Sequence, residues 1–172
     1  AHRYEADIVR SVGAILKHGD IQPGAKPVHW CVNCGSALAE AEVEYQNKTS
    51  PAIDVAFRVV DTAHFLSLLG TQENIVEQVA FAIWTTTPWT LPANQAVTLH
   101  PDLDYVLVKG RFGENLDAIC VLSGLLEDCL ARYGITEYEV LATFKGKQVE
   151  KQLLQHRFYH DRKVTLILGE HV

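Results

Sequence analysis

Short segments in which apolar and polar residues alternate recur along most of this chain, and they limit its fold more than any other feature. Ile53, Val55, Phe57 and Val59 alternate with other residues over 53–60, the pattern of a strand with one buried face. Further strands are predicted at 36–45, 76–86, 96–99, 105–109, 118–122, 138–144 and 164–168. Turns, not helical crossovers, join most of them. The pattern predicts a β-rich α+β fold, a small barrel-like core with peripheral helices.

Helical segments are fewer. They are predicted at 8–19, at 62–69 after a cap at Asp61 or Thr62, and at 123–133 with Ser123 as cap, and a polar helical piece is predicted after Gly146. The stretch 36–45 is ambiguous, since its Ala and Glu content favours helix. Its alternation favours a half-buried strand with Glu40, Glu42 and Glu44 on a solvated face, and we follow the alternation.

Composition excludes several classes of protein. The chain has 172 residues, 48% hydrophobic and 21% charged, as in an ordinary globular domain. Its net charge is −6, which excludes a basic module that binds nucleic acid through bulk phosphate neutralisation. The longest apolar run covers only residues 79–84, too short for a membrane span, and we expect no membrane association. Four cysteines favour a reducing, cytoplasmic setting over a disulfide framework.

One candidate metal site involves Cys31 and Cys34, which stand in a Trp-Cys-x-x-Cys-Gly sequence. Two thiolates at this spacing can bind one side of a tetrahedral Zn²⁺ ion, but a structural zinc needs four ligands, so this is a half-site only. Cys120 and Cys129 lack such spacing and are predicted to be buried packing residues. An incidental pair and a thioredoxin-like redox motif are the alternatives.

A second candidate site is a threonine-rich segment at 84–94, called the threonine motif below. Its prolines fix the backbone, its threonine hydroxyls donate and accept hydrogen bonds without charge, and its indoles offer stacking surface. This combination suits a neutral, hydroxyl-bearing ligand such as a ribose, although a strand running into a stiff loop explains it too. The candidate residues are Trp84, Thr85, Thr86, Thr87, Trp89, Thr90 and Asn94.

Other chemistry is less evident. His156 and His160 have i, i+4 spacing without a metalloprotease glutamate between them, and we predict a solvated face there. The sequence shows no nucleophile elbow, no glycine-rich phosphate loop and no convincing triad.

At these two motifs the chain resembles the editing domain of isoleucyl-tRNA synthetases, an insertion in the catalytic domain of class I aminoacyl-tRNA synthetases. The matching pieces are KPVHWC at 26–31, SALAEAEVEY at 36–45, KTSPAIDVAF at 48–57 and WTTTPWTLPAN at 84–94. Valyl and leucyl relatives carry an arginine where this chain has Thr87. The resemblance weakens between about residues 61 and 78 and after about residue 110.

The resemblance implies a domain of the valyl, isoleucyl and leucyl editing type that hydrolyses valine wrongly attached to isoleucine tRNA, with valyl-adenylate as a second candidate substrate. Thr85, Thr86 and Thr87 would contact the ester, the terminal adenosine or the attacking water. Trp84, Trp89 and Thr90 would bound the substrate, and Asn94 would brace the loop. The implied partners are the 3′ end of tRNA(Ile) carrying valine and the rest of the synthetase chain.

The resemblance also implies an organisation and a set of cofactors. Residues 1–27 would be a helix and linker from the parent catalytic domain, and 28–172 an editing domain cut short on its C-terminal side. ATP and Mg²⁺ would serve the parent domain, not this segment, and Zn²⁺ would be completed by later cysteines. The absence of methionine also suggests a segment of a longer protein. An inactive module that binds the tRNA 3′ end and a Cys-x-x-Cys redox protein remain the competing hypotheses.

Overall fold

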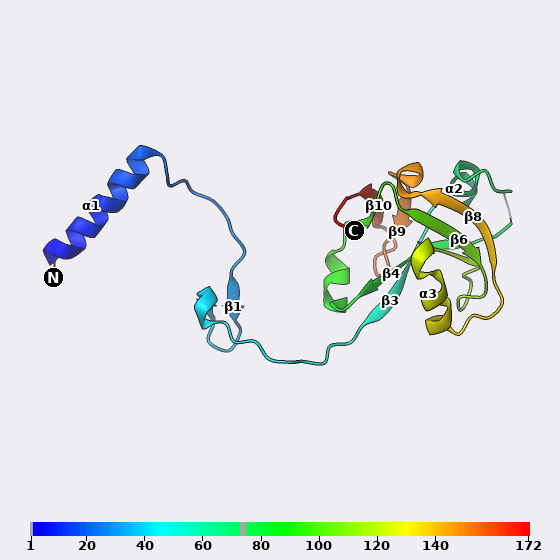
Figure 1. The fold of residues 1–172 in the computed structure, drawn as a ribbon, viewed down its shortest axis with the longest axis horizontal. Helices are drawn as coiled ribbons and strands as arrows, with labels where there is room; N and C mark the ends of the chain where they lie inside the picture. The colour runs from blue at the N-terminus through cyan, green and yellow to red at the C-terminus, as the bar shows by residue number, and fades with distance from the viewer. Residues whose placement is uncertain (1, 73–74) are drawn as a thin grey trace. The chain divides into compact units, whose positions relative to one another are not determined.

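The chain forms two compact units, residues 1–48 and 49–172. They are seen in a computed structural model that describes residues 2–72 and 75–172 (Figure 1). This division falls later than the boundary predicted between residues 27 and 28. The assignment of the first 27 residues to a parent catalytic domain stays a prediction.

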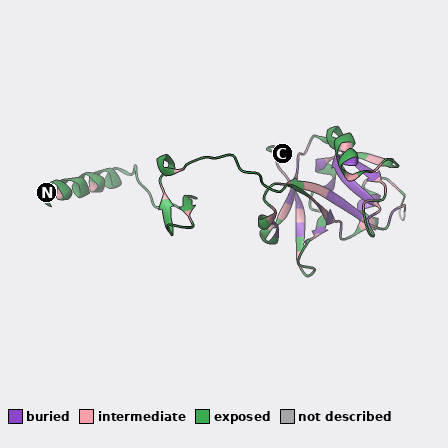
Figure 2. Cartoon of the chain, turned by 90° about the horizontal axis from the view of Figure 1, so that it is seen from below, coloured by how far each residue is buried: buried purple, intermediate pink, exposed green. Residues whose placement is uncertain are grey.

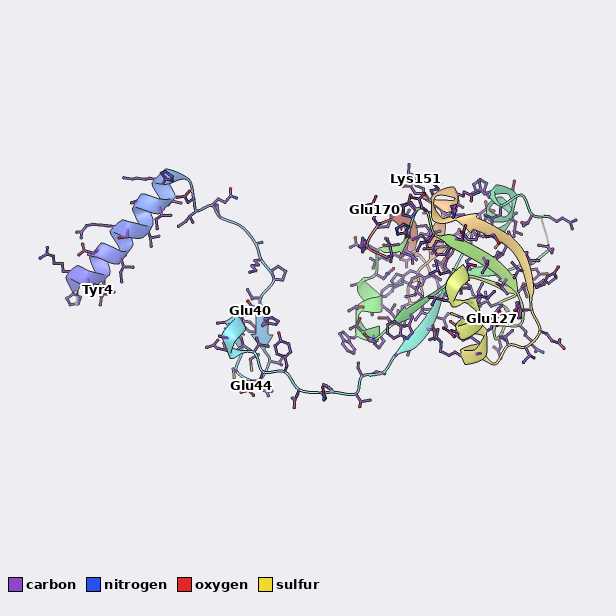
Figure 3. The ribbon with its side chains drawn as sticks, in the orientation of Figure 1. Tyr4, Glu40, Glu44, Glu127, Lys151 and Glu170 are labelled. Atoms are coloured by element: carbon purple, nitrogen blue, oxygen red, sulfur yellow. The ribbon has the colours of Figure 1, made fainter. Side chains whose placement is uncertain are left out.

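The first unit has little buried surface. Helix α1 (His2–His18) contains no buried residue, and Tyr4 projects from it into solvent (Figure 3). The helix ends at Gly19, whose φ of 95° only glycine adopts readily. Strands β1 (His29–Cys31) and β2 (Ser36–Leu38) form an antiparallel hairpin, followed by the short 3₁₀ helix η1 (Glu40–Glu42).

The strand predicted at 36–45 is mostly wrong. Only Ser36–Leu38 is extended and paired. At Ala39 the chain turns, because its backbone N–H donates a 2.7 Å hydrogen bond to the Glu42 carboxylate. The predicted exposure of Glu40 and Glu44 is confirmed (Figure 3). Alternation by itself does not sustain a strand, since strand preference depends on pairing and packing with neighbouring strands.

The second unit is built on a five-stranded sheet in the order β3-β4-β7-β6-β8. Its strands are β3 (Ile53–Arg58), β4 (Val79–Thr85), β6 (Asp104–Lys109), β7 (Ala118–Leu122) and β8 (Glu139–Lys145). The pairing is antiparallel except between β4 and β7. Helix α2 (Thr62–Leu68) connects β3 to β4, and the Asp61 carboxylate caps it by accepting the His64 N–H at 2.9 Å.

A three-stranded sheet in the order β5-β10-β9 completes the unit. Its strands are β5 (Ala96–Leu99), β9 (Leu153–Gln155) and β10 (Lys163–Leu168). A single bridge between Val59 and Leu154 joins the two sheets on one side. On the other side, the Lys147 N–H donates to the Pro101 carbonyl at 3.1 Å. The β-rich α+β class is therefore confirmed, but the described strands do not pair into a closed barrel.

Several predicted helices and ends differ from the structure. Ser123 does not cap a long helix: it opens the 3₁₀ turn η3 (Ser123–Leu125), and α3 (Leu126–Tyr133) begins after it. The polar piece after Gly146 holds only the 3₁₀ turn η4 (Gly146–Val149) before β9. β9 was missed because it is three residues long and is defined by its pairing with β10.

Buried residues gather on both faces of the five-stranded sheet (Figure 2). Between the two sheets, Phe65, Phe81 and Phe144 meet edge to face with ring centroids 5.7–6.5 Å apart, an arrangement that aromatic rings prefer. On the other face, α3 covers Val106, Val108 and Ile119 through Leu130. Burial of Cys120 and Cys129, predicted from their spacing, is confirmed.

Gly146 lets the end of β8 approach the end of β5. A Cβ atom there would collide with the His100 carbonyl oxygen and lie 3.2 Å from the Leu99 Cβ. We therefore expect Gly146→Ala to lower the free energy of unfolding by roughly 1–3 kcal/mol, the usual cost of overpacking. Gly124→Ala, which meets nothing within 4 Å, is the matched control. Urea denaturation monitored by tryptophan fluorescence measures both, and equal midpoints would contradict this account.

Candidate functional site

The threonine motif begins where β4 leaves the core. Val79, Ala80 and Phe81 at the start of the strand are buried, whereas Thr85 at its end is half-buried. Ile53 of β3 pairs with Thr85, so the edge of the sheet fixes the position of the first threonine. The chain then turns into the 3₁₀ helix η2 (Pro88–Ala93), with Pro88 at its first position.

The three consecutive threonines, Thr85, Thr86 and Thr87, lie together and partly satisfy one another. The Thr85 Oγ1 accepts the Thr87 backbone N–H at 3.0 Å and lies 3.2 Å from the Thr87 Oγ1. The Thr86 carbonyl accepts the Ser50 hydroxyl at 3.1 Å. Thr86 is exposed, and its hydroxyl makes no hydrogen bond to another described residue. Neutral groups thus hold the threonine end of the loop.

The second half of the motif braces the first. The Thr90 hydroxyl donates to the Thr87 carbonyl at 2.8 Å. Asn94 donates its side-chain amide to the Ala96 carbonyl at 2.9 Å, and its backbone N–H bonds to the Leu91 carbonyl. The Asn94 Oδ1 is buried without a partner among the described residues. Arg162 from the far end of the chain donates to the Pro92 carbonyl at 3.2 Å.

Both tryptophans of the motif are exposed. Trp89 on η2 is 67% exposed and close in sequence to the threonines, and Trp84 is 58% exposed. Side chains alternate between the faces of a strand, so Trp84 shares the face of Ala80 and Ala82, whereas Thr85 continues the face of Phe81. The structure therefore does not bring Trp84 together with Thr85. Its predicted role in substrate binding stays a prediction.

Cys31 and Cys34 occupy the tight turn of the β1–β2 hairpin. The Cys34 backbone N–H donates to the Cys31 Sγ at 3.3 Å, and Gly35 turns the chain with a φ of 63°. The hydrogen bonds from Cys34 lower the pKa of the Cys31 thiol, and the same side-chain contact raises the pKa of Cys34. The second cysteine precedes a strand, not a helix. This geometry fits two ligands of a zinc site, and no cluster of three metal-binding side chains occurs within residues 2–72 and 75–172.

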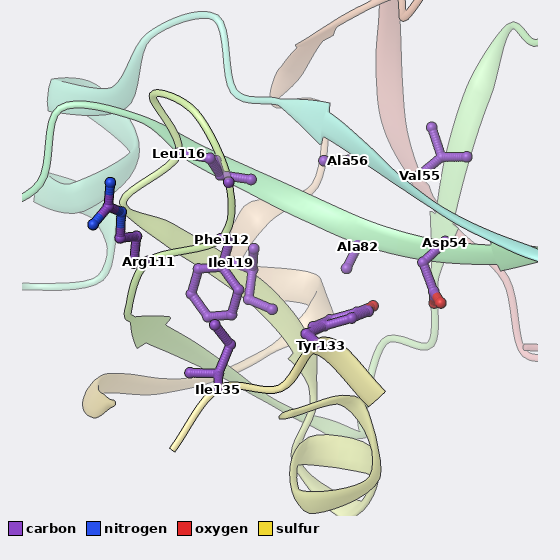
Figure 4. A pocket seen from close by; sticks show the side chains of 11 residues that line it. Asp54, Val55, Ala56, Ala82, Arg111, Phe112, Leu116, Ile119, Tyr133 and Ile135 are labelled. Atoms are coloured by element: carbon purple, nitrogen blue, oxygen red, sulfur yellow. The ribbon is translucent and has the colours of Figure 1, made fainter. Parts of the chain in front are cut away.

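A cavity of about 310 Å³ that the sequence does not reveal lies on the α3 face of the sheet (Figure 4). Its walls are mainly apolar, with Phe112, Ile119 and Ile135 grouped at one end and Tyr133 and Asp54 toward the other. Burial and the neighbouring Asp54 charge raise the pKa of Tyr133 to about 12. Asp54 itself lies 3.0 Å from the Arg132 Nε. No residue of the threonine motif lines this cavity.

The prediction of a solvated face at His156 is wrong. His156 is only 1% exposed, and its Nδ1 accepts the backbone N–H groups of Phe158 and Tyr159 at 3.1 and 3.2 Å. Spacing alone missed it because the loop after β9 folds back over the ring. His160, in contrast, is exposed as expected.

A family model described as class I tRNA synthetases (I, L, M and V) matches residues 1–158. The chain belongs to this family. Among synthetases, it is 52% identical to the isoleucine–tRNA ligase of Nitrosococcus oceani and 52% identical to that of Legionella pneumophila strain Lens, each over 171 residues. Both matches cover 99% of this chain and 18% of the relative, so the chain spans less than a fifth of these synthetases.

Solved structures of synthetase editing domains share the fold. The editing domain of the P. falciparum cytosolic leucyl-tRNA synthetase matches with a TM-score of 0.60 over 70% of this chain and 56% of its own, at 12% identity. The structure named GlLeuRS-CP1 matches with a TM-score of 0.56 over 70% of this chain and 49% of its own, at 14% identity. In the described part of this synthetase segment, no helix has the length and apolarity that a membrane crossing requires.

The hairpin geometry generates a metal prediction. We expect Cys31 and Cys34 to share Zn²⁺ with two further ligands in the complete synthetase, and the 172-residue chain to bind the ion weakly, because two thiolates fill half a tetrahedron. Metal analysis after gel filtration measures this, with Cys31→Ser in the complete synthetase expected to release the ion and Cys129→Ser as the control. One tightly bound zinc per short chain would contradict it and direct the search to His29, Cys120 and Cys129.

Proposed function

We propose that this chain is the part of an isoleucyl-tRNA synthetase that hydrolyses valine from mischarged tRNA(Ile). The observation that carries the proposal is the threonine motif at the end of β4, in a segment with the editing-domain fold and 52% identity to isoleucine–tRNA ligases. The partners in this proposal are the valine-bearing 3′ end of the tRNA and the rest of the synthetase.

A physical limit explains why such a domain is needed. A pocket that selects isoleucine over valine gains one methylene, about 1–3 kcal/mol, a general value for which isoleucyl-tRNA synthetases are themselves the standing example. A second pocket that admits valine and rejects isoleucine by overpacking adds a similar ~1–3 kcal/mol. Because the two selections act in series, their discrimination factors multiply.

The proposed chemistry needs no protein nucleophile. A water molecule adds to the carbonyl carbon of the aminoacyl ester, the bond to the ribose oxygen breaks, and that oxygen takes a proton to leave a free tRNA hydroxyl and valine. The ester is already reactive, so holding the water and the carbonyl in a fixed geometry supplies much of the rate. The Thr86 hydroxyl and the paired Thr85 and Thr87 hydroxyls supply neutral hydrogen bonds for that task.

The remaining motif residues act as walls and braces in this proposal. Trp89 and Thr90 bound the amino-acid side chain, and Trp84, which faces away from Thr85, would contact a part of the substrate beyond the ester. Asn94 holds η2 through its bonds to Ala96 and Leu91. The Cys31–Cys34 hairpin would hold Zn²⁺ as a structural ion, which stabilises the fold of its neighbourhood and takes no part in hydrolysis.

The first test places a charge in the motif. Thr87 is exposed, so Thr87→Arg leaves the fold intact while its bulk and charge occupy space that a neutral ligand needs. In the complete synthetase we expect kcat/KM for hydrolysis of valyl-tRNA to fall at least ~10-fold, about 1.4 kcal/mol, and isoleucine activation to survive. Thr136→Arg, at another exposed threonine, is the control. Equal loss of both activities would indicate misfolding and remove support for the site.

The second test concerns loop geometry. Thr85→Ala removes the acceptor of the Thr87 N–H, and a lost hydrogen bond of this kind costs about 0.5–1.5 kcal/mol. We expect valyl-tRNA hydrolysis to slow several-fold, whereas Thr85→Ser, which keeps the hydroxyl, retains most of the rate. Single-turnover deacylation measures both. If the serine variant is as slow as the alanine variant, the threonine methyl group matters and the hydrogen bond does not.

An inactive module that binds the tRNA 3′ end is the alternative that these assays separate. Such a module would bind uncharged tRNA normally, and the complete synthetase would release valine from valyl-tRNA no faster than buffer does. The threonine motif would then serve ribose recognition alone.

A further inference from the structure

A small basic cavity lies where β3 ends beside the loop that follows β9. It measures about 220 Å³ and is lined by Ala56, Arg58, Gln155, His156, Arg157 and His160. Every titratable side chain in this lining is basic, although the chain carries a net charge of −6. A concentration of guanidinium and imidazole groups without a lining carboxylate favours an anion.

The buried His156 ring presents a hydrogen-bond donor that the protein leaves unused. Its Nδ1 accepts two backbone N–H groups, so the ring proton resides on Nε2. That Nε2 is buried and has no partner among the described residues. Buried donors are normally satisfied. Because this nitrogen has almost no solvent-accessible surface, it is shielded from the open part of the cavity that His156 lines.

The cavity borders a hollow that runs toward η2 on the β3 face of Ala56 and Arg58, and no threonine of the motif lines either one. This wider hollow of about 640 Å³ shares Ala56, Arg58 and Arg157 with the cavity and extends to Ile53 and to Leu91 of η2. Phe158, 54% exposed, also lines this hollow. The acidic residues on its walls are Asp54, which is paired with Arg132, and Glu114, whose carbonyl accepts Arg58 at 3.4 Å. At about 3.3 Å per residue, Ile53 and Arg58 lie roughly 17 Å apart.

We propose that this basic cavity binds a backbone phosphate of the single-stranded 3′ end of the tRNA whose terminal nucleotide lies at the threonine motif. The proposal rests on the proposed function and extends it to a second contact a few nucleotides from the ester. Arg157 and Arg58 supply the bidentate donors that phosphate oxygens accept, and Phe158 offers a face for base stacking between the two sites.

The experiment is a double-mutant cycle between protein charge and phosphate charge in the complete synthetase. Arg157 is exposed, so Arg157→Gln removes a charge without disturbing the core. On the tRNA side, a set of valyl-tRNAs is prepared in which one phosphate linkage near the 3′ end is replaced by a neutral methylphosphonate, a different linkage in each. With ordinary valyl-tRNA, we expect Arg157→Gln to raise KM about tenfold and to leave kcat nearly unchanged. With a valyl-tRNA whose contacted linkage is already neutral, the same substitution should leave KM unchanged. The slope of log KM against log salt should fall by about 0.7–0.9 per lost contact.

Lys163→Gln is the matched control, since Lys163 is exposed and lines neither hollow. An Arg157→Gln effect of the same size for every backbone, or no effect, would overturn the proposal. A second arm titrates inorganic phosphate at constant ionic strength. Suppose phosphate inhibits the wild-type enzyme but not Arg157→Gln, and the cycle shows no coupling to any tRNA linkage. The cavity would then bind free phosphate, and the proposed RNA contact would be overturned.

The same cycle separates this proposal from the hydrolytic function. If the complete synthetase does not hydrolyse valyl-tRNA, the proposed function fails, and dissociation constants for uncharged tRNA replace KM in the cycle. Coupling between Arg157 and one linkage would then still support the phosphate contact, and its absence would overturn it.

Discussion

The pairing of β4 with β3 on one side and β7 on the other holds the candidate site in place. The first residues of β4 are buried among the phenylalanines of the core, and its last residues emerge at the end of the sheet. Because six consecutive residue pairs fix β3 against β4, a slip of one position would exchange the faces of every side chain. The position of Thr85 is therefore set by the same packing that stabilises the domain.

Hydrogen bonds define the shape of the loop after β4. The threonines satisfy backbone groups of their own loop, and Asn94 and Arg162 fasten η2 from its far end. In the proposed hydrolysis, a loop held in this way would position a water molecule beside the ester. Its neutrality also suits an ester and a ribose. The anionic backbone of the proposed tRNA ligand requires positive charge, and Arg58 and Arg157 carry it at the other end of β3.

The Cys31–Cys34 pair is brought together by a single turn of the chain, whereas the position of the threonine motif depends on strand pairing. A tight turn with glycine at positive φ brings two thiols and one N–H···S bond together within a few residues. No long-range packing is needed to form that half-site. A tetrahedral zinc site would need two further ligands that are distant in sequence. The threonine motif differs, because the pairing of β4 with β3 sets its position and its own loop fixes the Thr85 and Thr87 hydroxyls.

Local sequence patterns were sufficient to predict the β-rich class, the short helix capped by Asp61, the burial of Cys120 and Cys129, and both candidate motifs, because strand alternation, caps and turn residues act over a few positions. They misjudged 36–45, Ser123 and the region after Gly146. Long-range packing instead determines that Leu153–Gln155 becomes a strand beside β10. Packing also buries His156 and joins Arg58 to Arg157 in one cavity, since residues far apart in the sequence meet only where the two sheets come together.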